Sequence, residues 1–172
     1  PNCGRRQLHR PNRRDRQQPE VVMFGDFMRA LTDEIQEAEH MPPGGVMIQI
    51  PEDLLIIFDR GHLNQIMWNL VRNAWQHCQK REGSIRIVAR AGYMGDAVIC
   101  ELNDDGPGIP AELRPQIFEP FFTTRPGGTG LGLYIARELA DANGAALELL
   151  PKGPGAHFRM TLKRALPPER PA

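Results

Sequence analysis

The sequence is short of cysteine, of aromatic residues and of any excess charge. Its 172 residues include three cysteines, no two of them in a C-x-x-C pair, so a disulfide framework is not expected and a reducing compartment is favoured. Basic and acidic residues number 21 each, which gives no electrostatic reason to expect nucleic acid or a membrane surface as a partner. No apolar run approaches the roughly 20 residues of a membrane span, and no signal peptide is expected. We therefore expect one cytoplasmic domain without direct membrane contact.

What the sequence does contain is an alternation of apolar patterns. Helical stripes are predicted over 24–38, over about 16 residues after a capping Asp59, and over 131–143. Residues 103–130 are rich in glycine, proline and threonine and are long for a connection, which is typical of a functional or a disordered loop. Strands are predicted at 21–24, 46–50, 54–58, 85–91, 97–102, 145–150 and 157–162.

The second predicted helix carries a line of side-chain amides beside its apolar face. Asn69, Asn73 and Gln76 are spaced four and three residues apart, and His77 follows Asn73 by four. Asparagine is a mediocre helix former, so two of them on one helical line require a reason. One interpretation is a solvated face. The other is that the carboxamide oxygen of Asn73 helps to hold Mg2+, a hard cation that takes oxygen ligands and shares them with phosphates.

The long loop begins and ends with glycine motifs. At its start, in NDDGPGIP, the Asp104 carboxylate can accept a hydrogen bond from the exocyclic amine of a purine, while Gly106 and Gly108 would let the backbone approach a flat ligand. At its end, GGTGLGL at 127–133 precedes a helix, where free backbone N–H groups suit phosphate. The alternative for this second motif is a flexible glycine loop with a helix cap. Together the three motifs specify a metal, a base and phosphates.

Four motifs in this order, NLVRNA, DDGPGI, FEPFFTT and GGTGLGLYIA, resemble the asparagine, first glycine, phenylalanine and second glycine boxes of the ATP-binding catalytic domain of bacterial sensor histidine kinases. The likeness covers residues 21–163. RRDRQQPE, FDRGHLNQ and NAWQHC further resemble the type IV pilus (PilS-like) and nitrogen-regulation sensor kinases. The resemblance implies a two-layer α/β (α+β) sandwich, in which three helices cover one face of a mixed sheet and ATP is held between a helix and a lid.

The resemblance also implies roles for individual residues. Asn73 would bind Mg2+, Asn69 would lie near the phosphates, and Asp104 would bind the adenine amino group. Arg125 would be a γ-phosphate cation, unless it is only an exposed arginine of a short lid. Asn69, Asn73, Arg125 and Thr129 would act in catalysis. The ATP site as a whole would consist of Asn69, Asn73, His77, Asp104, Gly106, Gly108, Ile109, Thr123, Thr124, Gly128, Thr129, Gly130, Leu131 and Gly132, with Arg125 beside it.

The phenylalanine box has two interpretations. Phe118, Phe121 and Phe122 would anchor the lid and meet the helix that carries the phosphoacceptor, or they would simply pack in the core, an alternative that fits Phe121 equally well. Only Arg125 and Pro126 lie between FFTT and GGTG, so a long mobile lid is not expected.

Two features depart from the family pattern. Gln76 and His77 stand where many members carry a lysine or arginine followed by an aromatic residue, so His77 is either a phosphate donor or a structural histidine. None of the five histidines has the H-E-[IL]-R-x-P context of a phosphoacceptor. We interpret 1–20, which holds six arginines, as a basic tail from the end of a dimerisation helix and its linker, and 164–172 as a flexible C-terminal tail.

The implied function is transfer of the γ-phosphate of Mg-ATP to a histidine on dimerisation helices absent from this chain, for relay to a response regulator of the sigma-54 activator type. This fragment, expected to be monomeric, would be the cytoplasmic part of a membrane-anchored sensor. ATPases of the same fold carry a glutamate where this chain has Asn69. An amide cannot act as a general base, so a kinase is predicted. The alternatives are a protein serine kinase of the same superfamily and a non-catalytic nucleotide-binding or docking module.

Overall fold

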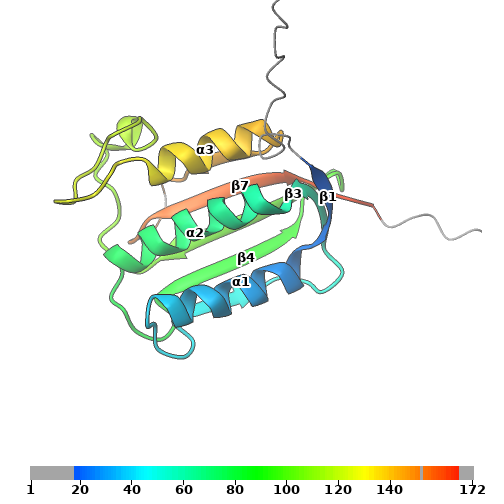
Figure 1. Cartoon of the computed structure of the whole chain (residues 1–172), viewed down its shortest axis with the longest axis horizontal. Helices are drawn as coiled ribbons and strands as arrows, with labels where there is room; N and C mark the ends of the chain where they lie inside the picture. The colour runs from blue at the N-terminus through cyan, green and yellow to red at the C-terminus, as the bar shows by residue number, and fades with distance from the viewer. Residues whose placement is uncertain (1–17, 152, 167–172) are drawn as a thin grey trace, which may run out of the picture.

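A five-stranded mixed sheet with three helices on one face forms the body of the molecule in the computed structural model, which describes residues 18–151 and 153–166 (Figure 1). The strands lie in the order β2-β4-β5-β7-β6, and β2 and β4 are parallel while the other pairs are antiparallel. The predicted two-layer sandwich is confirmed. The sheet consists of β2 (Val46–Gln49), β4 (Ile85–Ala91), β5 (Ala97–Asp104), β6 (Ala146–Leu149) and β7 (His157–Lys163). The helices are α1 (Phe24–Ala38), α2 (Arg60–His77) and α3 (Gly132–Ala142), with a short 3-10 turn η2 (Arg114–Gln116) in the long loop.

A separate antiparallel pair, β1 (Pro19–Met23) and β3 (Leu55–Asp59), lies beside the main sheet. Both strands were predicted, but their pairing was not. The C-terminal end of the described chain also joins this pair of strands. Arg164 forms an isolated antiparallel β-bridge with Ile56. The buried Ala165 donates its N–H to the Leu55 carbonyl at 3.0 Å. Strand β1 thus begins at Pro19 and the last described backbone pairing involves Ala165, while most of the predicted tails, 1–17 and 167–172, lie outside the described residues.

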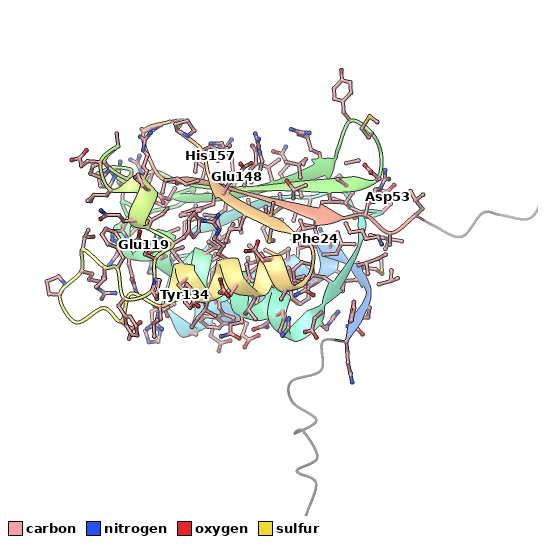
Figure 2. The ribbon with its side chains drawn as sticks, turned by 90° about the horizontal axis from the view of Figure 1, so that it is seen from above. Phe24, Asp53, Glu119, Tyr134, Glu148 and His157 are labelled. Carbon is pink, nitrogen blue, oxygen red and sulfur yellow. The ribbon has the colours of Figure 1, made fainter. Side chains whose placement is uncertain are left out.

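The core lies between the sheet and the helices. All seven apolar residues of the α2 face are buried because β strands pack beneath them. Strand β5 alternates, so that Val98, Cys100, Leu102 and Asp104 face the helical layer. Burial raises the pKa of the Cys100 thiol to about 12, which leaves it protonated at neutral pH. Figure 2 shows the two layers from the side, with Glu148 and His157 on the sheet. No helix in the described ranges is both long and apolar enough to cross a membrane.

Asp59 caps α2, as the sequence predicts, and also joins two other elements. Its Oδ1 accepts from the His62 backbone N–H at 2.9 Å, and its Oδ2 accepts from the Gln18 N–H at 2.9 Å. Asn143, just beyond α3, accepts from the Asp59 N–H at 3.0 Å and contacts His62 Nδ1 at 2.9 Å. These bonds tie the start of α2 to the end of α3 and so fix the helix that carries the predicted metal asparagine.

We expect Asp59→Ala to lower the free energy of unfolding by about 1–2 kcal/mol at pH 7, the usual effect of losing an N-cap. Although partial burial raises the pKa of Asp59, the N–H donors of Gln18 and His62 outweigh it and hold the pKa below its ordinary value of 3.8. The carboxylate therefore stabilises the fold above pH 3.8, and this contribution is lost as pH falls through the lower folded pKa.

Urea unfolding of wild type and variant at pH 7 and pH 3 measures this difference. The difference in unfolding free energy between the wild type and Asp59→Ala should be smaller at pH 3 than at pH 7. Asp59→Asn, which keeps an acceptor oxygen, is the control and should lose less than the alanine variant at pH 7. An equal loss for both variants at both pH values would contradict the capping role.

Candidate nucleotide-binding site

A cavity of about 390 Å³ lies between α2, the 105–131 loop and the start of α3. Figure 1 shows the C-terminal end of α2, the loop and the start of α3 at one end of the molecule, and Figure 2 shows the loop residue Glu119 at the same end as Tyr134 of α3. The cavity brings together most of the predicted site residues. Those that line it are Asn69, Asn73, His77, Asp104, Gly108, Ile109, Thr123, Thr124, Arg125, Gly128, Thr129, Gly130 and Gly132.

Gly106 and Leu131 are the two predicted site residues that do not line the cavity. The packing around Gly106 gives one reason for a glycine at this position. A Cβ at 106 would lie 2.5 Å from the His77 carbonyl oxygen, so the glycine allows the loop to pass close to the end of α2. Leu131 occupies the N-cap position of α3, and its N–H lies 3.4 Å from Thr129 Oγ1.

Asp104 is the buried carboxylate of the site, with only 3% of its surface exposed. Its Oδ1 accepts from the Gly106 N–H at 2.8 Å and the Ala156 N–H at 3.3 Å. Within residues 18–151 and 153–166, no donor reaches Oδ2. Burial raises the pKa of Asp104 above its ordinary value, and the N–H groups of Gly106 and Ala156 oppose that rise. The side chain therefore offers the cavity a free acceptor in a dry setting.

Asp105, the neighbouring carboxylate, has a structural role. It accepts from the Gln79 N–H at 2.9 Å and Ser84 Oγ at 3.0 Å, and it pairs with Arg81 Nε at 3.3 Å. Burial raises the pKa of Asp105, but the Gln79 N–H, the Ser84 hydroxyl and Arg81 together outweigh it and lower the pKa overall. The two adjacent carboxylates thus have different roles, since Asp105 fixes the segment between α2 and β4 while Asp104 faces the cavity.

The polar line of α2 faces the start of α3. Asn69 and Asn73 both line the cavity, and the Asn69 Oδ1 atom lies 3.5 Å from where a Cβ of Gly132 would be. Among residues 18–151 and 153–166, no side chain caps the N-terminus of α3. Within that part of the chain its first N–H groups therefore lack intrahelical or side-chain acceptors, which is the arrangement that suits an anion. No group of three or more His, Cys, Asp or Glu residues that could hold a metal ion occurs in the described part of the chain.

The glycine loop is packed against the phenylalanine box. A Cβ at Gly130 would overlap the backbone of Phe121, and a Cβ at Gly128 would lie 2.7 Å from Thr123 Oγ1. Gly130 has φ +68 and Phe121 has φ +66. The two segments can approach this closely only because position 130 lacks a side chain.

The phenylalanines have different environments. Phe118 packs edge-on against Phe158, with ring centroids 6.2 Å apart, and the Arg137 guanidinium lies 4.9 Å from its ring. Phe122 is half-buried and lines the cavity. Phe121 is 75% exposed, so the core-packing alternative for this residue is wrong.

The cavity lining contains two arginines and one histidine. Arg125 lies on the exposed loop, and its guanidinium has no partner among the described residues. Arg72 also lines the cavity and was not predicted. His77 is exposed, and its Nδ1 lies 2.9 Å from the Asn73 carbonyl oxygen of its own helix.

Sequence reasoning missed most of the apolar lining. These residues give no local signal, because leucine, isoleucine and phenylalanine in a loop or helix are indistinguishable from core residues. Ala156, whose N–H donates to Asp104 Oδ1, lies 52 positions away in the chain. The lining residues that we did not predict to bind nucleotide are Arg72, Gln76, Pro110, Leu113, Ile117, Phe122, Gly127, Leu133 and Ala156.

The fold and the cavity define a nucleotide-binding α/β domain. Residues 58–166 match the histidine kinase-, DNA gyrase B- and HSP90-like ATPase family, and the chain belongs to that family. It is similar to two solved structures. One is the nucleotide-free catalytic domain of histidine kinase ThkA (TM-score 0.72, 28% identity, 86% of this chain and 96% of that one). The other is full-length ShkA in complex with AMPPNP (TM-score 0.69, 28% identity, 88% and 33%).

Its sequence relatives include proteins named as sensor or sensory kinases. It is 38% identical over 112 residues to the sensor protein kinase PilS of Pseudomonas aeruginosa, which covers 63% of this chain and 21% of PilS. It is 34% identical over 129 residues to the nitrogen regulation protein NtrY of Azorhizobium caulinodans, and the match covers 72% of this chain and 17% of NtrY. It is 30% identical over 137 residues to the sensory histidine kinase/phosphatase NtrB of Salmonella typhimurium, and the match covers 69% of this chain and 39% of NtrB. The chain thus spans between 17% and 39% of these relatives, and it is an ATP-binding catalytic domain of the sensor histidine kinase class.

Proposed function

We propose that this domain binds Mg-ATP in the cavity and transfers the γ-phosphate to a histidine on dimerisation helices that are absent from the chain. One observation carries the proposal. A single cavity joins the buried Asp104 carboxylate, the amides of α2 and the uncapped N-terminus of α3, which are complementary to a purine amine, a hydrated cation and phosphates.

The donor chemistry of the site fits ATP. The free Oδ2 of Asp104 can accept from the adenine amine, and the apolar lining of Ile109, Leu113 and Ile117 suits a flat base. The backbone of Gly128, Thr129 and Gly130, together with the start of α3, would receive the phosphates.

The donor set also fits Mg2+ held largely through the nucleotide. A carboxylate cage is not found in the described residues, whereas Asn73, whose carboxamide has an oxygen that can bind a cation, lines the cavity with Asn69 one turn before it. Mg2+ keeps waters and phosphate oxygens among its ligands and needs only one or two from protein. When bound, the ion would supply neutralisation of the charge that develops on the phosphate oxygens. Asn73 would hold it, and Asn69 would orient its water or phosphate ligands.

The reaction requires little covalent chemistry from this chain. A histidine nitrogen from the dimerisation helix would form the bond to the γ-phosphorus as the bond to the β,γ-bridging oxygen breaks, and ADP would leave. The residues of this chain would contribute position and charge, with Arg125 and Thr129 placed beside the phosphates. Asn69 stands where a hydrolytic member would need a general base, and an amide cannot accept that proton. We therefore propose a kinase and not an ATPase.

The partners follow from the same proposal. The acceptor helices and a response regulator, of the sigma-54 activator type by likeness to PilS and the nitrogen-regulation proteins, would act with this domain. The longer protein would be a membrane-anchored bacterial sensor with this domain in the cytoplasm. On its own the domain is proposed to be monomeric, because dimerisation would belong to the other helices.

Reconstituted phosphotransfer tests the function. The chain would be mixed with γ-labelled Mg-ATP and a dimerisation-helix fragment that carries the acceptor histidine, with an acceptor His→Ala fragment as the control. We expect acid-labile, alkali-stable label on the intact fragment only. The Asn73→Ala variant should reduce that label at least tenfold because a ligand of the cation is lost.

Three results would contradict the proposal. Label that resists acid would indicate a hydroxyl acceptor and favour a serine kinase. Rapid Mg2+-dependent ATP hydrolysis by the chain alone, abolished by Asn69→Ala, would show that Asn69 supports attack by water. Nucleotide binding without any transfer would favour a non-catalytic module.

A further inference from the structure

Arg72 is a cation that faces the cavity but is paired outside it. It lies on α2 between Asn69 and Asn73 in sequence, and it contributes to the cavity wall. Its Nε lies 3.1 Å from Glu39 Oε1. Within residues 18–151 and 153–166, its two Nη groups have no partner. The guanidinium therefore has unused donors beside the candidate nucleotide site.

The pair with Glu39 is weakly held. The Arg72 side chain is 60% exposed and that of Glu39 is 23% exposed, so solvent screens their attraction. Glu39 is also the C-cap residue of α1, and the last turn of that helix carries no basic residue. A carboxylate at a helix C-terminus faces the negative end of the helix dipole. Arg72 is thus the cation that compensates Glu39, and a stronger anion can compete for it.

Among the described residues, the α2 wall of the cavity offers no other permanent cation. Its remaining polar side chains are the neutral amides of Asn69, Asn73 and Gln76, together with His77. Across the described lining, the only other permanent cation is Arg125, which lies on the loop. A triphosphate carries several negative charges, and guanidinium groups bind phosphate through two parallel hydrogen bonds.

We infer that Arg72 is a phosphate-binding residue, and that Glu39 pairs with its guanidinium until nucleotide binds. When nucleotide enters, the guanidinium exchanges the Glu39 carboxylate for phosphate oxygens, and Glu39 thereby sets how tightly the site binds. Glu39 is a positioning residue in this exchange, since it acts only through Arg72. The inference rests on the proposed function, because it requires the nucleotide phosphates to lie against α2.

Calorimetric titration of the chain with a non-hydrolysable ATP analogue plus Mg2+, and separately with adenosine, tests the exchange. We expect Arg72→Gln to weaken analogue binding about tenfold, the effect of losing one charge-assisted contact. Glu39→Gln should strengthen it roughly threefold, since the competing surface ion pair is removed. Adenosine binding should be unchanged in both variants. In the Arg72→Gln background, Glu39→Gln should have no effect.

Arg29→Gln is the matched control. Arg29 is also exposed and also paired with a carboxylate, at 2.7 Å from Asp26, but it does not line the cavity. This variant removes the same charge and should bind the analogue as the wild type does. Unchanged analogue affinity in both Arg72→Gln and Glu39→Gln, with wild-type binding intact, would overturn this inference alone. Failure of the folded wild type to bind the analogue would overturn the proposed function and the inference together.

Discussion

The Asp104→Asn variant is expected to fold and to lose about 100-fold in affinity for an ATP analogue. The Asn Oδ1 atom can still accept from the Gly106 and Ala156 N–H groups, so the local fold is kept. Nδ2 then replaces the free Oδ2 and points a donor at the place proposed for the adenine amine. Two donors facing each other in a buried site leave both unsatisfied, which costs about 2–3 kcal/mol.

The stability of this variant should move in the opposite direction from its affinity. Burial raises the pKa of Asp104, so the folded state disfavours the ionised form. A carboxyl whose pKa is raised on folding makes the protein less stable as pH rises through the interval between its unfolded and folded values. Removing that ionisation should leave Asp104→Asn at least as stable as the wild type at pH 7.

Calorimetric titration and urea unfolding on the same samples measure both effects, and Asp105→Asn is the matched control. Asp105 is adjacent and acidic, but it holds Gln79, Ser84 and Arg81 and does not line the cavity. Asp105→Asn should therefore lose stability and keep its affinity. Similar affinities of the two variants for the ATP analogue would contradict the proposal that Asp104 binds the adenine base.

The elements of this fold could be predicted because their signals are local. The α2 stripe and its Asp59 cap are contained within about 20 consecutive residues, and the 3.6-residue period reports which side is buried. The ends of β1 and β7 were placed less well. Their last pairings depend on distant partners, because Pro19 pairs with Asp59, 40 positions away, and Arg164, just after β7, bridges Ile56, 108 positions away. No local pattern encodes those partners.

The candidate site was predictable where chemistry is unusual for its element and unpredictable where packing decides. Paired asparagines in a helix and an aspartate at a strand end stand out against their surroundings, and Asn73 and Asp104 do line the cavity. Gly155 does not stand out, yet a Cβ there would overlap the Asp104 carbonyl oxygen. Arg72 reads as an ordinary surface residue until α1 brings Glu39 beside it.

The Gly130→Ala variant is expected to lose nucleotide affinity at least tenfold more than Gly127→Ala. Both glycines have positive φ, +68 and +76, so an L-residue at either position is strained by roughly 1 kcal/mol. A Cβ at 127 meets nothing within 4 Å, whereas a Cβ at 130 would overlap the backbone of Phe121. Only Gly130→Ala must therefore separate the glycine loop from the phenylalanine box.

Analogue titration and urea unfolding of the two variants, compared with the wild type, separate strain from displacement. Gly127→Ala reports the strain alone, and any further loss in Gly130→Ala reports movement of the loop. Equal affinities would show that the loop tolerates the displacement and that its phosphate contacts do not depend on Phe121. A specific loss in Gly130→Ala would mean that the exposed Phe121 segment and the proposed phosphate loop form one unit. Any helix that docks on Phe121 would then act directly on the geometry of the phosphates.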